Sequence, residues 1–114
     1  MTETKIYVGL NDSETREQVF GTETYIKILK NVCCAYDTPF SFSVEEGGYI
    51  HEDGGYTRET TLVLTLIDAG AGTVNEIAKD LCFFFNQESV LITKGEVETF
   101  TVTAESYSPV EAED

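Results

Sequence analysis

The fold is decided by residues 40–67, which read FSFSVEEGGYIHEDGGYTRETTLVLTLI. The first arm of this stretch alternates serines with the apolar residues Phe40, Phe42 and Val44. Such a period-2 pattern is typical of a half-buried strand. The second arm, residues 60–67, is a run of β-branched residues and leucines that is apolar enough for a central strand. Asp53-Gly54 is a strong turn signal, and Gly47-Gly48 suggests a bulge or bend. The stretch therefore predicts a long β-hairpin.

A helix is predicted on each side of this hairpin. Before it, apolar residues recur at the spacing of one helix face, at Tyr25, Ile28, Leu29, Val32, Cys33 and Tyr36. Thr22 is the expected N-cap, and Pro39 ends this helix. After the hairpin comes a loop over residues 68–72, and then Thr73 and Glu76 with the spacing of a capping box. The apolar stripe of the second helix comprises Val74, Ile77, Ala78, Leu81 and Phe84 or Phe85.

Three further strands are expected, over residues 4–10, 89–93 and 97–103. In the first, Ile6, Val8 and Leu10 alternate with other residues, and in the last Val97 is followed by threonines at every second position. The resulting order, βαββαβ with an added C-terminal strand, predicts an α+β ferredoxin-like sandwich with both helices on one face of an antiparallel sheet. We expect one domain over residues 1–104 and an acidic, flexible tail over residues 105–114.

The charge balance restricts the partners of the chain. Its 114 residues carry 21 acidic and 7 basic side chains, a net charge of −14. Seven scattered cations form no phosphate-neutralising stripe, so direct nucleic-acid binding is not expected. An acidic surface steers instead towards basic partners. No apolar run reaches the roughly 18 residues of a membrane span, and no secretory signal is visible, so we expect a cytoplasmic protein that does not bind a membrane.

Conventional catalytic and metal-binding motifs are not found. The three cysteines lack Cys-x-x-Cys spacing, which favours reduced thiols over a disulfide framework or a zinc site. The single histidine lies in His51-Glu52-Asp53, where a solvated loop is favoured over a metal site because adjacent strand residues point to opposite faces. We therefore expect no catalytic residue, no metal and no cofactor, and hence no enzyme.

Three short motifs resemble those of a known family. They are Ile6-Tyr7-Val8-Gly9-Leu10, Arg58-Glu59 leading into Val63-Leu64, and Phe85-Asn86-Gln87-Glu88-Ser89-Val90. In this order they resemble an uncharacterised bacterial family of unknown function, over roughly residues 5–100 of this chain. The resemblance implies a ferredoxin-like fold and no established activity.

Two groups of polar residues are candidates for function. The hairpin carries the acids Glu45, Glu46, Glu52, Asp53 and Glu59, with Tyr49 and Tyr56 between them. Paired carboxylates can act as general acid and base, but these positions look exposed, so a solvated surface or a docking face for a basic protein is favoured. Gln87-Glu88 follows the second helix, where a structural hydrogen-bonding role is favoured over a ligand role. Glu88 could pair with Lys79, Lys94 or Arg58, and Arg58-Glu59 could form a cross-strand ion pair.

Three functional hypotheses follow. The first is a non-enzymatic inhibitor that occupies the basic nucleic-acid-binding surface of a partner, as a nucleic-acid mimic or a phage anti-CRISPR protein would. The second is an oligomeric ligand-binding or sensing module, such as a homodimer, in which the strand at residues 96–103 pairs between subunits. The third is a small enzyme in which Tyr49, Tyr56 or His51 performs acid–base chemistry. The first two, both protein-binding functions, are favoured.

Overall fold

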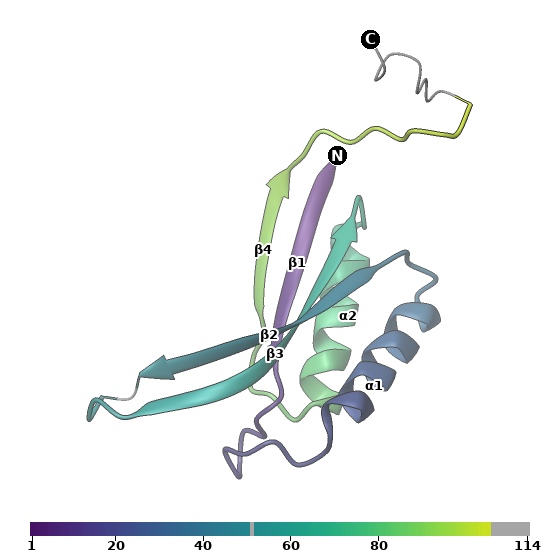
Figure 1. Ribbon diagram of the computed structural model, residues 1–114. Helices are drawn as coiled ribbons and strands as arrows, with labels where there is room; N and C mark the ends of the chain where they lie inside the picture. The colour runs from purple at the N-terminus through teal and green to yellow at the C-terminus, as the bar shows by residue number, and fades with distance from the viewer. Residues whose placement is uncertain (51, 106–114) are drawn as a thin grey trace.

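The computed structural model describes residues 1–50 and 52–105, apart from the side chain of Tyr49. Its elements are β1 (Thr2–Gly9), α1 (Thr22–Ala35), β2 (Ser41–Ile50), β3 (Tyr56–Ile67), α2 (Ala71–Phe84) and β4 (Leu91–Glu96). The four strands form one antiparallel sheet in the order β2-β3-β1-β4. Both helices cover the same face of this sheet (Figure 1). The predicted ferredoxin-like α+β fold is therefore confirmed.

The core lies between the sheet and the two helices. Leu64 is in its centre, paired with Ile6 of β1 on one side and with Phe42 of β2 on the other. The helices cover these strand residues with Leu29 from α1 and Ile77 from α2, both fully buried. The buried positions of β1 and α2 are those that the period-2 and helical patterns predict.

The hairpin of β2 and β3 is regular along its whole length. Pairing runs without interruption from Ser41 opposite Thr65 to Ile50 opposite Tyr56, so the predicted bulge at Gly47-Gly48 is wrong. Gly48 instead accommodates the Tyr56 ring, because a Cβ atom there would lie 2.5 Å from the Tyr56 hydroxyl oxygen. The predicted turn is confirmed: Gly54 has a φ of +89°, and the Asp53 Oδ1 atom accepts a hydrogen bond from the Gly55 N–H at 2.8 Å.

The N-termini of the helices differ from the prediction. Gly21, not Thr22, is the N-cap of α1, and Gly70 is the N-cap of α2, so α2 begins at Ala71 and not at Thr73. Both glycines have extended backbone, and neither helix has a side-chain cap. The Thr73-x-x-Glu76 motif therefore lies inside α2, where no capping box forms.

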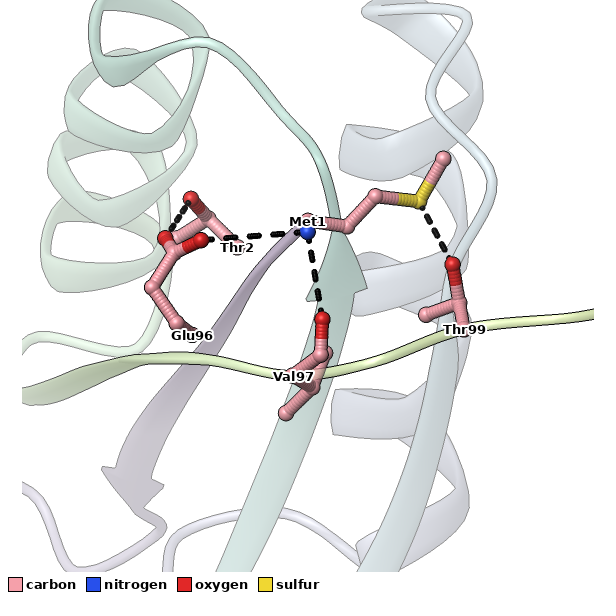
Figure 2. A network of polar contacts seen from close by, with 5 residues as sticks. All are labelled: Met1, Thr2, Glu96, Val97 and Thr99. Atoms are coloured by element: carbon pink, nitrogen blue, oxygen red, sulfur yellow. Dashed lines mark hydrogen bonds and ion pairs between the residues drawn. The ribbon is translucent and has the colours of Figure 1, made fainter.

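The predicted added strand at residues 97–103 is wrong, since the structure has no strand over residues 97–105. Strand β4 instead runs through Gly95 and ends at Glu96. The Met1 amine donates to the Val97 carbonyl oxygen at 3.1 Å (Figure 2). The Val97 N–H donates in return to the Met1 carbonyl oxygen at 2.8 Å. Pairing with β1 stops at this point, so the residues after Val97 lie beyond the N-terminal end of β1 (Figure 1). Residues 106–114 of the predicted tail lie outside the described part of the chain.

The molecule is elongated. Its Cα radius of gyration is 17.8 Å, whereas a compact domain of this length has about 13 Å. The far half of the β2–β3 hairpin projects beyond the helices, and the segment after β4 leads away from the sheet (Figure 1). Large surfaces of both segments therefore face solvent in the single chain.

All three cysteines are free, with Cys33 buried, Cys34 exposed and Cys82 half-buried. Burial, with a smaller contribution from Cys34, raises the pKa of the Cys33 thiol to about 11. Cys33 is thus a protonated core residue at neutral pH, as reduced structural thiols are expected to be. Among the described helices, none is long and apolar enough to cross a membrane.

Candidate functional site

A cleft lies just beyond the end of β1, where three segments distant in sequence come together. Its volume is about 360 Å³, and we call it the β1-end cleft. It is lined by Asn11, Asp12, Ser13, Arg16, Glu59, Gln87, Glu88 and Ser89. The first four follow β1, Glu59 belongs to β3, and the last three follow α2. The second and third motifs of the family resemblance line this cleft with Glu59 and with residues 87–89, and the first motif, residues 6–10, ends directly before Asn11.

Glu59 is held in place from the β1 side of the cleft. Its Oε2 atom accepts a hydrogen bond from the Asn11 N–H at 3.0 Å. The carboxyl group lies against Gly9, where any Cβ atom would overlap it. The Asn11 side-chain amide donates to the Arg58 carbonyl oxygen at 3.3 Å. Gly9 and Asn11 together thus determine where the Glu59 carboxylate lies, and Glu59 itself remains half-buried.

The segment after α2 is positioned by the way that helix ends. Asn86 has left-handed backbone, with a φ of +51°, and the N–H groups of Asn86 and Gln87 donate to the carbonyl oxygens of Phe83 and Cys82. This is the Schellman arrangement, in which asparagine tolerates the left-handed position. It directs the Gln87 amide to the Asn11 carbonyl oxygen, to which the amide donates a hydrogen bond. The structural role predicted for Gln87 is thereby confirmed.

The loop after β1 is fixed by Asp12. Its Oδ1 atom accepts hydrogen bonds from the N–H groups of Glu14 at 2.8 Å and Thr15 at 3.1 Å, while Oδ2 accepts one from the Asn86 side chain at 2.7 Å. The hydrogen bond from Asn86, followed by those from the two N–H groups, lowers the pKa of Asp12 below its ordinary value. Asp12 is therefore an anion at neutral pH, and it ties the loop to the end of α2.

Arg16 is the one basic residue that lines the β1-end cleft. Its backbone is left-handed, with a φ of +65°, a conformation that is uncommon for arginine. The Arg16 N–H donates to the Asp12 carbonyl oxygen at 2.8 Å, which closes the turn. In the described part of the chain, the Arg16 guanidinium forms no ion pair.

The predicted partner-binding residues do not form one group. Glu59 lies in the β1-end cleft, whereas Glu52 and Asp53 lie in the turn of the hairpin. Glu45 and Glu46 are exposed on β2, and Glu46 forms an ion pair with Arg58 at 3.2 Å. Tyr56 packs over Gly48 on the projecting half of the hairpin. The side chain of Tyr49 and the whole of His51 lie outside the described residues.

Two predicted ion pairs are corrected. Arg58 pairs across the strands with Glu46 and not with Glu59, because the Glu59 carboxylate is turned towards Asn11. Glu88 is exposed and has no ion pair within the described ranges. Of its predicted partners, Lys79 pairs with Glu76 at 3.6 Å and Arg58 pairs with Glu46. Glu88 is therefore a free carboxylate at the edge of the cleft. The described residues also contain no cluster of three or more side chains suited to a metal ion.

The sequence reasoning missed Asn11, Asp12, Ser13, Arg16 and Ser89 as site residues. Asn11-Asp12-Ser13 has the composition of a turn, and nothing local distinguishes a turn that lines a cleft from one that only connects two elements. The available signal was the set of three motifs. All three motifs line or border the β1-end cleft, although they are far apart in the sequence.

Comparisons with known proteins establish the fold. No family model and no curated protein matches this chain. A phage SAM (S-adenosylmethionine) lyase, solved in complex with S-methyl-5'-thioadenosine, is similar over 94% of this chain and 92% of its own, with 24% identity and a TM-score of 0.64. The same lyase in the apo state gives 24% identity and a TM-score of 0.65. A DUF3240 family protein from Shewanella baltica OS155 covers 90% of this chain, 97% of its own length, at 7% identity and a TM-score of 0.52.

These likenesses include both an enzyme and a protein of an uncharacterised family. The second agrees with the predicted resemblance to a family of unknown function, although the match is one of structure. At these identities the likeness concerns the arrangement of the chain and not its chemistry.

The contact between Gly9 and Glu59 gives a prediction. Gly9→Ala should displace the Glu59 carboxylate and break its hydrogen bond from the Asn11 N–H, because the new methyl group would occupy the volume of the carboxyl group. Gly95→Ala in β4 is the matched control, since a Cβ atom there meets nothing within 4 Å. Amide hydrogen exchange of Asn11, followed by NMR, should be faster in Gly9→Ala than in Gly95→Ala. Equal exchange rates would contradict the role of Gly9.

Proposed function

We propose that this chain binds S-adenosylmethionine in the β1-end cleft and cleaves it, releasing S-methyl-5'-thioadenosine. The observation that carries the proposal is the Glu59 carboxylate, fixed at the cleft by Asn11 and Gly9. The end-to-end likeness to a phage SAM lyase supports it. This function differs from the non-enzymatic one expected from the sequence, which is tested separately below.

The shape and polarity of the β1-end cleft suit an adenosyl ligand. About 360 Å³ lies within the usual range of small-molecule sites, roughly 300–1,000 Å³. The Glu59 Oε2 atom is engaged by Asn11, and Oε1 has no donor among the described residues. A carboxylate only accepts hydrogen bonds, so it suits the two hydroxyl groups of a ribose. We therefore assign Glu59 to the ribose of the ligand.

The charges of the cleft complement those of the substrate. S-adenosylmethionine carries a sulfonium, an ammonium and a carboxylate, with a net charge of +1. The cleft presents three carboxylates, from Asp12, Glu59 and Glu88, and one guanidinium, from Arg16. An excess of negative charge attracts a cationic substrate and releases a neutral thioether product.

The cleavage itself requires no nucleophile from the protein. The bond between sulfur and the amino-acid chain breaks, and both electrons go to sulfur, which becomes the neutral thioether. The carbon that sulfur leaves forms a bond to the carboxylate oxygen of the same fragment, which closes a lactone, or the neighbouring carbon gives a proton to solvent and a carbon–carbon double bond forms. Neither path consumes water, so the bond is broken without hydrolysis, as in a lyase reaction. Because sulfur loses its positive charge, a carboxylate touching it would stabilise the substrate more than the transition state. Hydrogen bonds from the ribose hydroxyl groups to Glu59 avoid this cost, because they do not involve the sulfur.

The proposal is tested with the purified full chain and S-adenosylmethionine. We expect S-methyl-5'-thioadenosine to accumulate in proportion to protein concentration, measured by liquid chromatography with mass spectrometry. Incubation without protein corrects for spontaneous breakdown of the substrate. If the protein neither releases nor binds S-methyl-5'-thioadenosine, the proposed function is wrong.

The projecting hairpin supports a second candidate, the binding of a basic protein such as a nucleic-acid-processing enzyme. Glu45, Glu46, Glu52 and Asp53 are exposed along the hairpin, and Arg58 is the one arginine or lysine among its described residues. The apolar side chains of Ile50 and Tyr56 are 73% and 62% exposed on the same segment. Apolar residues surrounded by charge are typical of a protein interface.

The second candidate predicts binding that depends on the hairpin charges. A variant with amides at Glu45, Glu46, Glu52 and Asp53 should lose a basic partner that the parent chain retains in low salt. A control with amides at Glu17, Glu23, Glu98 and Glu105 has the same net charge and should retain it. Affinity purification at low and high salt compares the two variants, since exposed charges are screened beyond about 8 Å at physiological ionic strength. Equal retention of both variants would exclude the hairpin.

The alternative of an oligomeric binding module rests on the free edge of β2. This edge strand has neither lysine nor proline, the residues that commonly block pairing with another chain. Residues 97–103 keep a strand-like composition, although they do not form a strand in the described part of the chain. Light scattering over a range of concentrations tests self-association, and a strict monomer at every concentration would exclude it.

A further inference from the structure

Arg16 is the feature of the β1-end cleft that the proposed function leaves unused. Every other charged residue that lines the cleft is an acid, and Arg16 is one of only two arginines in the chain. The other arginine, Arg58, is engaged by Glu46 on the hairpin. In the described ranges, no carboxylate neutralises Arg16, although acids outnumber bases threefold in this protein.

The backbone holds Arg16 in an unusual conformation. Four described residues other than glycine have a positive φ, namely Arg16, Asp37, Asp68 and Asn86. Aspartate and asparagine tolerate this region, whereas arginine does so at a cost. The Arg16 conformation is imposed by the turn that Asp12 closes, with hydrogen bonds of 2.8 Å from the Arg16 N–H and 2.9 Å between the Asp12 N–H and the Glu17 carbonyl oxygen. Such local strain is often retained where a side chain must point to one place.

We infer that Arg16 binds the α-carboxylate of the amino-acid part of the substrate and thereby selects S-adenosylmethionine over adenosyl ligands without that group. This inference rests on the proposed function. A guanidinium matches a carboxylate with two parallel hydrogen bonds, which an ammonium cannot reproduce. With Glu59 on the ribose, the two residues would hold opposite ends of one ligand. Arg16 is then a specificity residue, and it takes no part in bond breaking.

The test compares two ligands that the protein does not consume. S-adenosylhomocysteine has the α-carboxylate and no sulfonium to leave, and S-methyl-5'-thioadenosine lacks the amino-acid part altogether. Arg16→Gln should weaken binding of S-adenosylhomocysteine by about tenfold and leave binding of S-methyl-5'-thioadenosine within about twofold of the parent chain. Arg16→Lys should recover part of the loss because it keeps the charge. Arg58→Gln is the matched control and should change neither affinity, since Arg58 lies outside the cleft.

The outcomes separate this inference from the function on which it rests. If Arg16→Gln binds both ligands as tightly as the parent chain, or weakens both equally, the role of Arg16 is wrong and the cleft remains the proposed site. If the parent chain binds neither ligand, the proposed function and the role of Arg16 fall together. Steady-state kinetics give a second measurement: Arg16→Gln should raise KM for S-adenosylmethionine, because the contact with the α-carboxylate is already made when the substrate binds.

Discussion

Glu59→Gln is expected to lower kcat/KM for S-adenosylmethionine by about 10- to 100-fold while the chain remains folded. The substitution removes the negative charge and turns one carboxylate oxygen into a donor. A hydrogen bond to a charged group contributes about 1.5–3 kcal/mol, which corresponds to this loss. Binding of S-methyl-5'-thioadenosine should weaken in parallel, because substrate and product share the ribose that Glu59 is proposed to hold. Initial rates and calorimetric titration measure the two effects.

Glu46→Gln is the control for this substitution. Glu46 is an exposed glutamate on β2, outside the β1-end cleft, and its Arg58 ion pair is on the surface. Exposed ion pairs contribute about 0–1 kcal/mol, so the variant should fold and turn over substrate like the parent chain. A Glu59→Gln variant with the parental rate would show that the cleavage occurs elsewhere or does not occur.

Leu64→Ala is expected to produce the largest loss of stability, about 2–5 kcal/mol in the free energy of unfolding. Leu64 is 0% exposed and lies between β1 and β2 under both helices. Its removal leaves a cavity where three strands meet, and the close-packed surroundings can fill it only in part. Domains of this size are stable by about 5–15 kcal/mol, so the loss is a large fraction of the total. Urea unfolding followed by circular dichroism, at fixed protein concentration, measures it.

Leu91→Ala is the control for the core substitution. The substitution removes the same atoms as Leu64→Ala, but from a side chain in β4 that is 63% exposed. We expect a loss within about 0.5 kcal/mol, because little apolar surface leaves contact with the protein. Equal losses for the two variants would contradict the assignment of the core to the helix-covered face of the sheet.

The fold could be predicted because its signals are local. The alternation of Ile6 and Val8, the helical spacing of Leu29 and Val32, and the turn at Asp53-Gly54 each identify an element from neighbouring residues. The wrong predictions concern segments whose structure depends on residues that are distant in the sequence. Residues 97–103 have the composition of a strand, but β1 pairs no further than Met1. Gly47-Gly48 matched the signature of a bulge, but the second glycine makes room for Tyr56.

The candidate site could be predicted only in part. Glu59 was identified, but as one of several hairpin acids, since sequence proximity groups it with Glu52 and Asp53. Its carboxylate in fact faces Asn11, 48 positions earlier in the chain. Arg16 was not identified because a single arginine in a polar loop has no pattern. The place of Glu59 depends on the antiparallel register of β1 and β3, which brings the end of one strand beside the middle of the other.

The arrangement of β1 has a consequence for how the chain folds during synthesis. This strand precedes both of its neighbours in the sheet, β3 and β4, which begin only at residues 56 and 91. The β2–β3 hairpin and each helix can form from residues close together in the chain, but the sheet remains incomplete until about residue 96 has left the ribosome. Closing such long loops is slow compared with forming a hairpin. The apolar side of β1 therefore stays without a complete sheet around it until β4 has been synthesised.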